Sequence, residues 1–184
     1  MNGWKKIRLS EISFLITKGT TPTTLGYKFA ERGVNFVKSE SISFDGQIDE
    51  SKFAFIDETT HQKLSRSIIE EKDILFSMAG VYLGKTAVVP KKILPANTNQ
   101  AVGIIRLDQS KAEPRFVHYH IRNKSYNRFL NNLVSQSAQP NFNLAEMGKL
   151  PITLPPLAEQ RAIAQVLGAM DAKIELNRQM NETL

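Results

Sequence analysis

The sequence has 184 residues, of which 41% are hydrophobic, which suits one globular domain with an appendage. It contains no cysteine, which excludes a disulfide scaffold, a cysteine-ligated zinc or iron–sulfur site and a cysteine nucleophile. No apolar run approaches the roughly 20 residues of a membrane span, and the start lacks the apolar core of a signal peptide. We therefore expect a cytoplasmic protein that makes no membrane contact.

The net charge of +6 is distributed unevenly along the chain. Residues up to Asp73 include 11 basic and 11 acidic side chains, the stretch from Ile74 to Pro156 includes 10 and 3, and the remainder from Leu157 includes 3 and 4. The basic surplus thus lies in the middle of the chain, interleaved with aromatic and amide residues. This mixture is typical of surfaces that contact phosphates and base edges, although a basic face can also be merely solvated.

Strands dominate the first half of the expected fold. A short strand and turn over Trp4–Ile12 opens the chain, and Ser10 can cap a helical turn over Phe14–Ile16. The turn Gly19-Thr20-Thr21-Pro22 ends this segment. The next expected strands are Val34–Lys38 and Ile42–Phe44, with Asp45-Gly46 as a hairpin signal after the second.

The second half alternates strands and helices. A short helix is expected over Glu58–Ser65, and a helix opened by Pro114 extends through Leu133. A polar loop, Ser135–Asn141, follows this helix. The expected strands are Asp73–Met78, Lys85–Pro90, Ala101–Leu107 and Leu150–Leu154, of which the third is the most apolar and β-branched. The pattern predicts an α+β fold.

A stiff junction separates this body from a final helix. Pro155 and Pro156 fix their own φ angles and bias Leu154 and Pro155 toward extended conformations, so the helix can begin only near Pro156 or Leu157. Residues spaced by four and three then form a coiled-coil seam: Ile163, Leu167, Met170, Ile174, Asn177, Asn181 and Leu184. The spacing alone leaves two alternatives open, a helix folded back on its own domain and a helix that pairs with another helix. Asn177 and Asn181 favour pairing, because a polar seam residue fixes register at some cost in stability.

Catalytic motifs are weak or absent. Gly80 and Gly84-Lys85 are one residue too close for a phosphate-binding loop. Asp57, Glu70 and Lys72 have the residue types of a metal-dependent nuclease, which we retain as an alternative function. His118 and His120 diverge on a helix and are interpreted as packing residues, so no metal site, catalytic residue or cofactor is expected.

Several of these features together resemble the specificity subunit of type I restriction-modification enzymes. The most specific is Leu154-Pro155-Pro156-Leu157-Ala158-Glu159-Gln160 followed by the helical seam; Trp4 with Leu9, the Gly19–Pro22 turn, Asp73-Ile74-Leu75, the Gly80–Lys85 loop and Asn99-Gln100 add to it. The resemblance implies a strand-rich, globular target recognition domain over residues 1–154 and a long, coiled-coil-type spacer and dimerisation helix over residues 155–184.

The resemblance also implies function and partners. The chain would read one half of a bipartite site on double-stranded DNA, while catalysis belongs to methyltransferase and restriction subunits that dock on the helix. A full subunit of the family has two such units, and this sequence has one, so we expect either a homodimer or half of a longer chain.

The predicted site residues follow from this interpretation. For DNA contact they are the loop residues Thr20, Thr21, Ser77, Tyr82, Lys85, Asn99, Gln100, Gln136, Gln139 and Asn141. For dimerisation they are Ile163, Leu167, Met170, Ile174 and Leu184. A third possible function is an assembly module whose basic face does not bind DNA.

Overall fold

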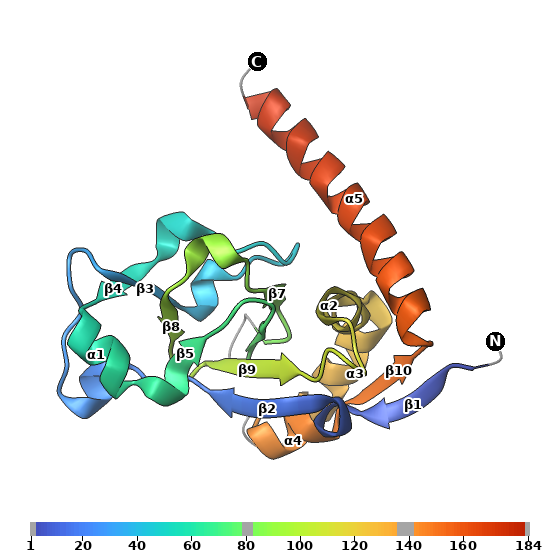
Figure 1. The fold of residues 1–184 in the computed structure, drawn as a ribbon, viewed down its shortest axis with the longest axis horizontal. Coiled ribbons are helices and arrows are strands. Elements are labelled where there is room, and N and C mark those ends of the chain that lie inside the picture. The colour runs from blue at the N-terminus through green and yellow to red at the C-terminus, as the bar shows by residue number, and fades with distance from the viewer. Residues whose placement is uncertain (1–2, 79–82, 136–141, 183–184) are drawn as a thin grey trace.

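The computed structural model describes residues 3–78, 83–135 and 142–182, without the side chains of 131–135 and 182. It shows an α+β fold with a body of two four-stranded sheets and several helices, from which the long helix α5 (Leu157–Glu182) projects (Figure 1). The predicted fold class is confirmed. No helix in the described parts is long and apolar enough to cross a membrane.

The beginning and the end of the body are joined in one small sheet. Strand β1 (Lys5–Arg8) pairs antiparallel with β10 (Pro151–Leu154), which directly precedes the prolines, and the two strands lie side by side in Figure 1. Trp4 packs edge-on against Phe116, with ring centroids 6.3 Å apart. The N-terminal strand therefore holds the junction from which α5 departs.

The central sheet has the strand order β2 (Ser13–Lys18), β9 (Val102–Leu107), β6 (Ile74–Ser77) and β7 (Thr86–Val88), all antiparallel. The expected strands that correspond to β9, β6 and β7 are confirmed. The helical turn expected over Phe14–Ile16 is wrong, because this segment is part of β2 and the helical turn is a 3-10 helix over Leu9–Ile12. Phe14 is 74% exposed on the edge strand, so apolar spacing misled the prediction there.

The second sheet has the order β4 (Ala54–Ile56), β3 (Val34–Val37), β8 (Ala96–Thr98) and β5 (Ile68–Ile69), in which β3 and β8 run parallel. β3 was predicted, whereas the other three are too short to give a periodic signal. The expected strand Ile42–Phe44 is wrong as a strand, since only an isolated bridge joins Ile42 to Ile48. That bridge does close the predicted hairpin turn, in which Gly46 has φ +81°.

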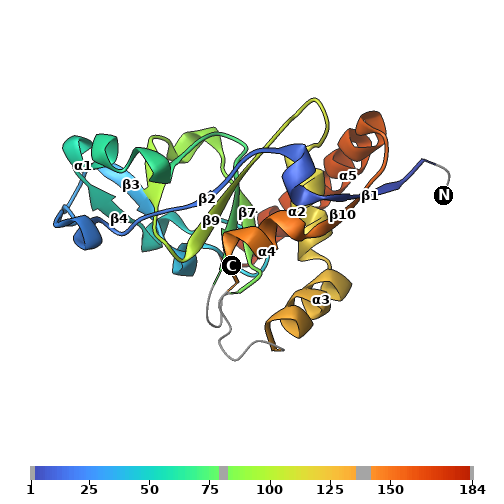
Figure 2. The same ribbon diagram turned by 90° about the horizontal axis from the view of Figure 1, so that it is seen from below.

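Helices and sheets enclose layered apolar clusters. One cluster lies between the sheets and includes Val37, Leu75 and Ile104, all fully buried. A larger one packs the central sheet against α2 (Pro114–Arg122), α4 (Leu144–Lys149) and β10. Figure 2 shows α2, α4, β10 and α5 on one side of β9, and α1 (Glu58–Lys63), β3 and β4 on the other. The α1 helix was predicted and α4 was not.

The long helix expected from Pro114 is interrupted. It divides at Asn123, where the backbone leaves helical geometry at φ −58° and ψ 136°, and resumes as α3 (Lys124–Ser135). The Asn123 side chain accepts a hydrogen bond from the backbone N–H of Ser125, 2.9 Å away, as residues that start a helix do.

His118 on α2 is a buried titratable group that lies against β7 and the turn at Gly46. Its Nδ1 lies 2.9 Å from the hydroxyl of Thr86 on β7, and a Cβ on Gly46 would come within 2.6 Å of its ring. Burial lowers the pKa of His118 to about 4; the positive charges of Arg122 and Arg115 lower it too, and Asp171 opposes them.

This burial predicts acid sensitivity. Between pH 6.5 and 4 the unfolded chain binds a proton at His118 that the folded chain does not. The free energy of unfolding therefore decreases as the pH is lowered through this window, by about 3 kcal/mol in all. The contribution is fully present above pH 6.5. Urea unfolding at several pH values should show that the free energy of unfolding decreases less in His118→Gln than in the wild type as the pH is lowered. An equal decline in both would contradict the assignment.

Candidate nucleic-acid interface

Loops that are distant in the sequence meet at one end of the central sheet. In Figure 1, β2 ends where β9 begins, beside β5 and β8. The backbone N–H of Thr20 donates to the carbonyl of Thr98, 3.2 Å away, and the hydroxyl of Thr21 donates to the side-chain oxygen of Gln100. Arg66 donates from Nη2 to the hydroxyl of Thr20 at 3.1 Å. We call Thr20, Thr21, Arg66, Asn99 and Gln100 the loop cluster.

A glycine makes this approach possible. An added Cβ on Gly19 would lie 2.0 Å from the carbonyl oxygen of Thr98 and 2.5 Å from that of Asn99, distances that no real side chain adopts. The backbone N–H of Gly19 donates to Val102, 3.2 Å away. Gly19 therefore lets the loop after β2 contact the β8–β9 connection directly.

Two further residues are joined to the same end of the sheet. The backbone N–H of Met78, after β6, donates to Ala101 at 2.8 Å, and that of Phe142 donates to Met78 at 3.4 Å. Met78 and Phe142 are therefore connected to the β8–β9 connection that carries Asn99 and Gln100. Tyr82, Gln136, Gln139 and Asn141, four of the predicted contact residues, lie outside the described residues.

The described contact residues differ in accessibility. Thr20, Thr21 and Asn99 are half-buried and Gln100 is exposed, so the structure brings these four residues together at a surface, and their contact with DNA stays a prediction. Asn99 accepts a hydrogen bond from the backbone N–H of Ala101 at 3.2 Å, which orders its loop. Ser77 is fully buried, in the last position of β6.

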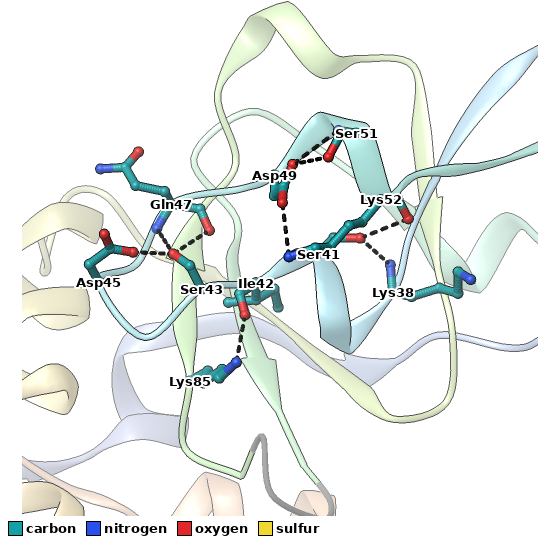
Figure 3. A network of polar contacts seen from close by, with 10 residues as sticks. All are labelled: Lys38, Ser41, Ile42, Ser43, Asp45, Gln47, Asp49, Ser51, Lys52 and Lys85. Atoms are coloured by element: carbon teal, nitrogen blue, oxygen red, sulfur yellow. Dashed lines mark hydrogen bonds and ion pairs between the residues drawn. The ribbon is translucent and has the colours of Figure 1, made fainter. Parts of the chain in front are cut away.

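Lys85 is held within the protein. It is 8% exposed, its Nζ donates to the carbonyl of Ile42 at 3.1 Å, and the same Nζ lies 4.0 Å from the centroid of the Phe44 ring. Figure 3 shows Lys85 reaching the segment in which Ser43 bonds to Asp45 and Gln47. Burial, with nearby Lys52, lowers the pKa of Lys85. A phosphate contact by Lys85 would first require these bonds to break.

Arg66 is the member of the loop cluster that sequence reasoning missed. It is exposed, and it follows α1 in a 3-10 helix over Ser65–Ser67. The first 73 residues have no net charge, whereas the basic surplus lies in the middle of the chain, so the charge pattern did not indicate Arg66. Only the placement of this 3-10 helix next to β2 shows that Arg66 reaches Thr20.

Each residue proposed for a nuclease makes a separate structural contact. Asp57 caps α1 by accepting from the backbone N–H of Thr60 at 2.7 Å, and Glu70 pairs with Arg106 at 2.5 Å. Lys72 donates to Gln109 at 3.2 Å. Among the residues that the structure describes, no group of three or more His, Cys, Asp or Glu side chains could hold a metal ion.

The base of α5 is fixed by a buried glutamine. Gln160 is 1% exposed; its Oε1 accepts from the backbone N–H of Glu113 at 2.9 Å, and its Nε2 donates to the carbonyls of Pro155 and Lys111. These bonds tie the first turn of the helix to the junction and to the start of α2. One side chain thus satisfies polar backbone groups of two segments.

The seam residues of α5 become more exposed along the helix. Ile163 and Leu167 are half-buried, and Ile163 packs against the largest apolar cluster. Met170 and Ile174 are 57% and 59% exposed. Leu184 lies outside the described residues. Met170 and Ile174 therefore form an apolar stripe at the surface of this chain.

Comparisons with known proteins agree with this geometry. A family model described as "Type I restriction modification DNA specificity domain" matches residues 1–184. The type I restriction enzyme MjaVIII specificity subunit of Methanocaldococcus jannaschii is 26% identical over 160 residues, which cover 85% of this chain and 37% of that protein.

Two solved structures share the fold. The crystal structure of the HsdS subunit from Thermoanaerobacter tengcongensis has a TM-score of 0.70 at 22% identity, over 99% of this chain and 45% of that one. The type I restriction-modification system S subunit from M. genitalium also has a TM-score of 0.70, at 14% identity, over 99% of this chain and 42% of that one. The chain thus spans less than half the length of these proteins.

The close approach at Gly19 can be tested by one methyl group. Gly19→Ala should lower the free energy of unfolding by about 2 kcal/mol, because backbone atoms of the β8–β9 connection would have to move. Gly148→Ala is a matched control, since its Cβ would meet side-chain atoms of Ser10 and Ile16 only at ordinary contact distances of 3.5 Å and more. Thermal unfolding of both variants measures the difference. Equal stability of the two would contradict the packing described for the loop cluster.

Proposed function

The chain belongs to the family of type I restriction-modification DNA specificity domains, and from this premise we propose that it reads one half of a bipartite site on double-stranded DNA through the loop cluster. In this proposal, residues 1–154 form the target recognition domain and residues 155–184 the spacer helix. The chain itself performs no catalysis and acts through methyltransferase and restriction subunits.

The loop cluster is the observation that carries this proposal. It combines two hydroxyls, two amides and one guanidinium at one end of the central sheet. Backbone bonds from Gly19 and Thr20 hold the loop after β2, and side-chain bonds join Thr21 to Gln100 and Arg66 to Thr20. Amides and guanidinium groups can make two parallel hydrogen bonds to a base edge, and a good pair of this kind is worth about 1–3 kcal/mol of discrimination. Hydroxyls and basic residues nearby suit phosphate contacts, which position the domain.

The exposed stripe of α5 supports the second part of the proposal. Met170 and Ile174 would be covered if α5 packed against an equivalent helix, and the chain covers only 37–45% of the compared relatives. We propose that this helix comes from a second copy or from the other half of a longer subunit. Two recognition domains would then face two half-sites, with the helices between them as the docking place for methyltransferase subunits.

Salt-dependent binding tests the DNA part. The chain should bind duplex DNA with an affinity that falls steeply as salt rises, because phosphate contacts release counterions. Arg66→Ala should weaken binding by about 1–3 kcal/mol if Arg66 contacts a base, or reduce the salt slope by about 1 if it contacts a phosphate. Fluorescence anisotropy at several salt concentrations separates the two cases.

Lys173→Ala, which removes one exposed charge from α5, is the control and should leave the affinity nearly unchanged. Full affinity in Arg66→Ala would exclude Arg66 from the interface. Duplex binding that is absent or independent of salt, even with methyltransferase subunits present, would overturn the proposed DNA recognition and favour the assembly module.

Helix pairing has its own test. Met170→Glu should dissociate a dimer, because it places a charge in the apolar stripe, whereas Ala169→Glu, at an exposed position about 100° around the helix and outside the seam, should not. Each fully buried seam residue contributes about 1.5–3 kcal/mol, so the loss should exceed tenfold in the dimer dissociation constant. Analytical ultracentrifugation measures it. A monomeric wild type would overturn the pairing of two copies. The other half of a longer subunit would then remain as the source of the partner helix.

A further inference from the structure

The direction of α5 relative to the body depends on a polar contact with α2. The carboxylate of Asp171, in the middle of α5, accepts a hydrogen bond from the hydroxyl of Tyr119 at 2.8 Å. The guanidinium of Arg122 lies 3.4 Å from the same oxygen. Burial and the bond to Asp171 raise the pKa of Tyr119 to about 12, so its hydroxyl stays protonated and remains a donor. We call Tyr119, Arg122 and Asp171 the α2–α5 clasp.

A second contact lies farther along the helix. Arg178 donates to Asp45 at 3.0 Å, and Asp45 belongs to the hairpin turn after β3. Figure 3 shows how this turn is braced, with Ser43 bonded to Asp45 and Gln47, and Lys85 bonded to Ile42. The ion pair between Arg178 and Asp45 is half-exposed and weak by itself. The segment that carries Asp45 is held in place by the bond from Lys85 to the carbonyl of Ile42.

Together these contacts follow one face of the helix. Gln160, Asp171 and Arg178 are separated by 11 and 7 residues, close to whole numbers of helical turns, and Gln160 and Arg178 lie about 27 Å apart along the axis. Beyond Ala164 no described residue of α5 is buried. Apolar packing fixes only the base of the helix, and directional polar bonds fix the rest.

A small change in direction is large on the scale of DNA. Tilting the helix by roughly 10° about its base moves a point about 27 Å away by roughly 5 Å, more than the 3.4 Å rise of one base pair. If a second recognition domain is attached through α5, this tilt alters which separation of half-sites both domains can reach.

We propose that Tyr119, Arg122 and Asp171, supported by Asp45 and Arg178, are positioning residues that select the number of base pairs between the two half-sites. This inference rests on the proposed function of reading a bipartite site. The clasp touches neither the loop cluster nor the seam, so it affects spacing without affecting the bases read within a half-site or helix pairing.

Selection from a random duplex library tests this role. The chain, assembled with its methyltransferase subunits, is used as wild type, as Asp171→Ala and as Tyr119→Phe. The wild type should enrich two half-sites at one separation. Both variants should enrich the same half-sites at a wider range of separations, at least one base pair more on either side. Glu50→Ala, which removes an exposed ion pair with Lys92 elsewhere on the body, is the control and should keep the wild-type separation.

Each other outcome has a definite meaning. Wild-type separation in both variants would overturn the positioning role while leaving the proposed function intact. Altered half-site bases would also overturn it, by showing that the clasp acts inside the recognition domain. Failure of the wild type to enrich any bipartite site would remove the proposed function itself, and the inference with it.

A distance measurement tests the clasp independently of DNA. Because the chain has no cysteine, spin labels can be placed by Lys28→Cys on the body and Gln179→Cys near the end of α5, both exposed positions outside the seam. Pulsed electron paramagnetic resonance should give a narrow distance distribution in the otherwise unchanged protein and a distribution at least twice as wide with Asp171→Ala. Equal widths would overturn the clasp as the determinant of helix direction.

Discussion

The pairing of β1 with β10 is the constraint on which the rest of this structure depends. It brings residues from the two ends of the body together immediately before two prolines, so the polypeptide leaves the body in a fixed place. Gln160 then bonds both to the junction and to the start of α2. These contacts define the position of the body relative to α5 where the two parts meet, as the proposed reading of two half-sites requires.

The same logic explains where the loop cluster lies. The central sheet is rigid because its inner strands are buried on both faces, and its loops project from one end. Bonds such as those from Thr20 to Thr98 and from Met78 to Ala101 connect loops of different strands to one another. Polar side chains on such loops are pre-organised, which reduces the entropy lost on binding. The chemistry of a site can thus vary on these loops while the scaffold stays unchanged.

Long and strongly patterned elements were predictable from the sequence, and short ones were not. The β9 strand is an apolar, β-branched run, α5 has a spacing of four and three, and the junction prolines mark the start of α5. By contrast, β8 is buried yet contains Asn97 and Thr98, whose side chains bond to Leu64 and Val37 across the fold. Such bonds depend on tertiary contacts. Arg66 escaped notice for the same reason, and Lys85, chosen as an exposed loop tip, is directed inward by its contact with Ile42.

DNA binding by the loop cluster can be tested directly by hydrogen–deuterium exchange of the chain with and without a duplex that carries the selected site. Amide exchange reports local opening and burial segment by segment. Bound DNA should slow exchange in residues 19–21, 65–67 and 99–101 and leave exchange in the exposed distal half of α5 unchanged. Slower exchange confined to α5, or no change in those three loops at saturating DNA, would contradict it.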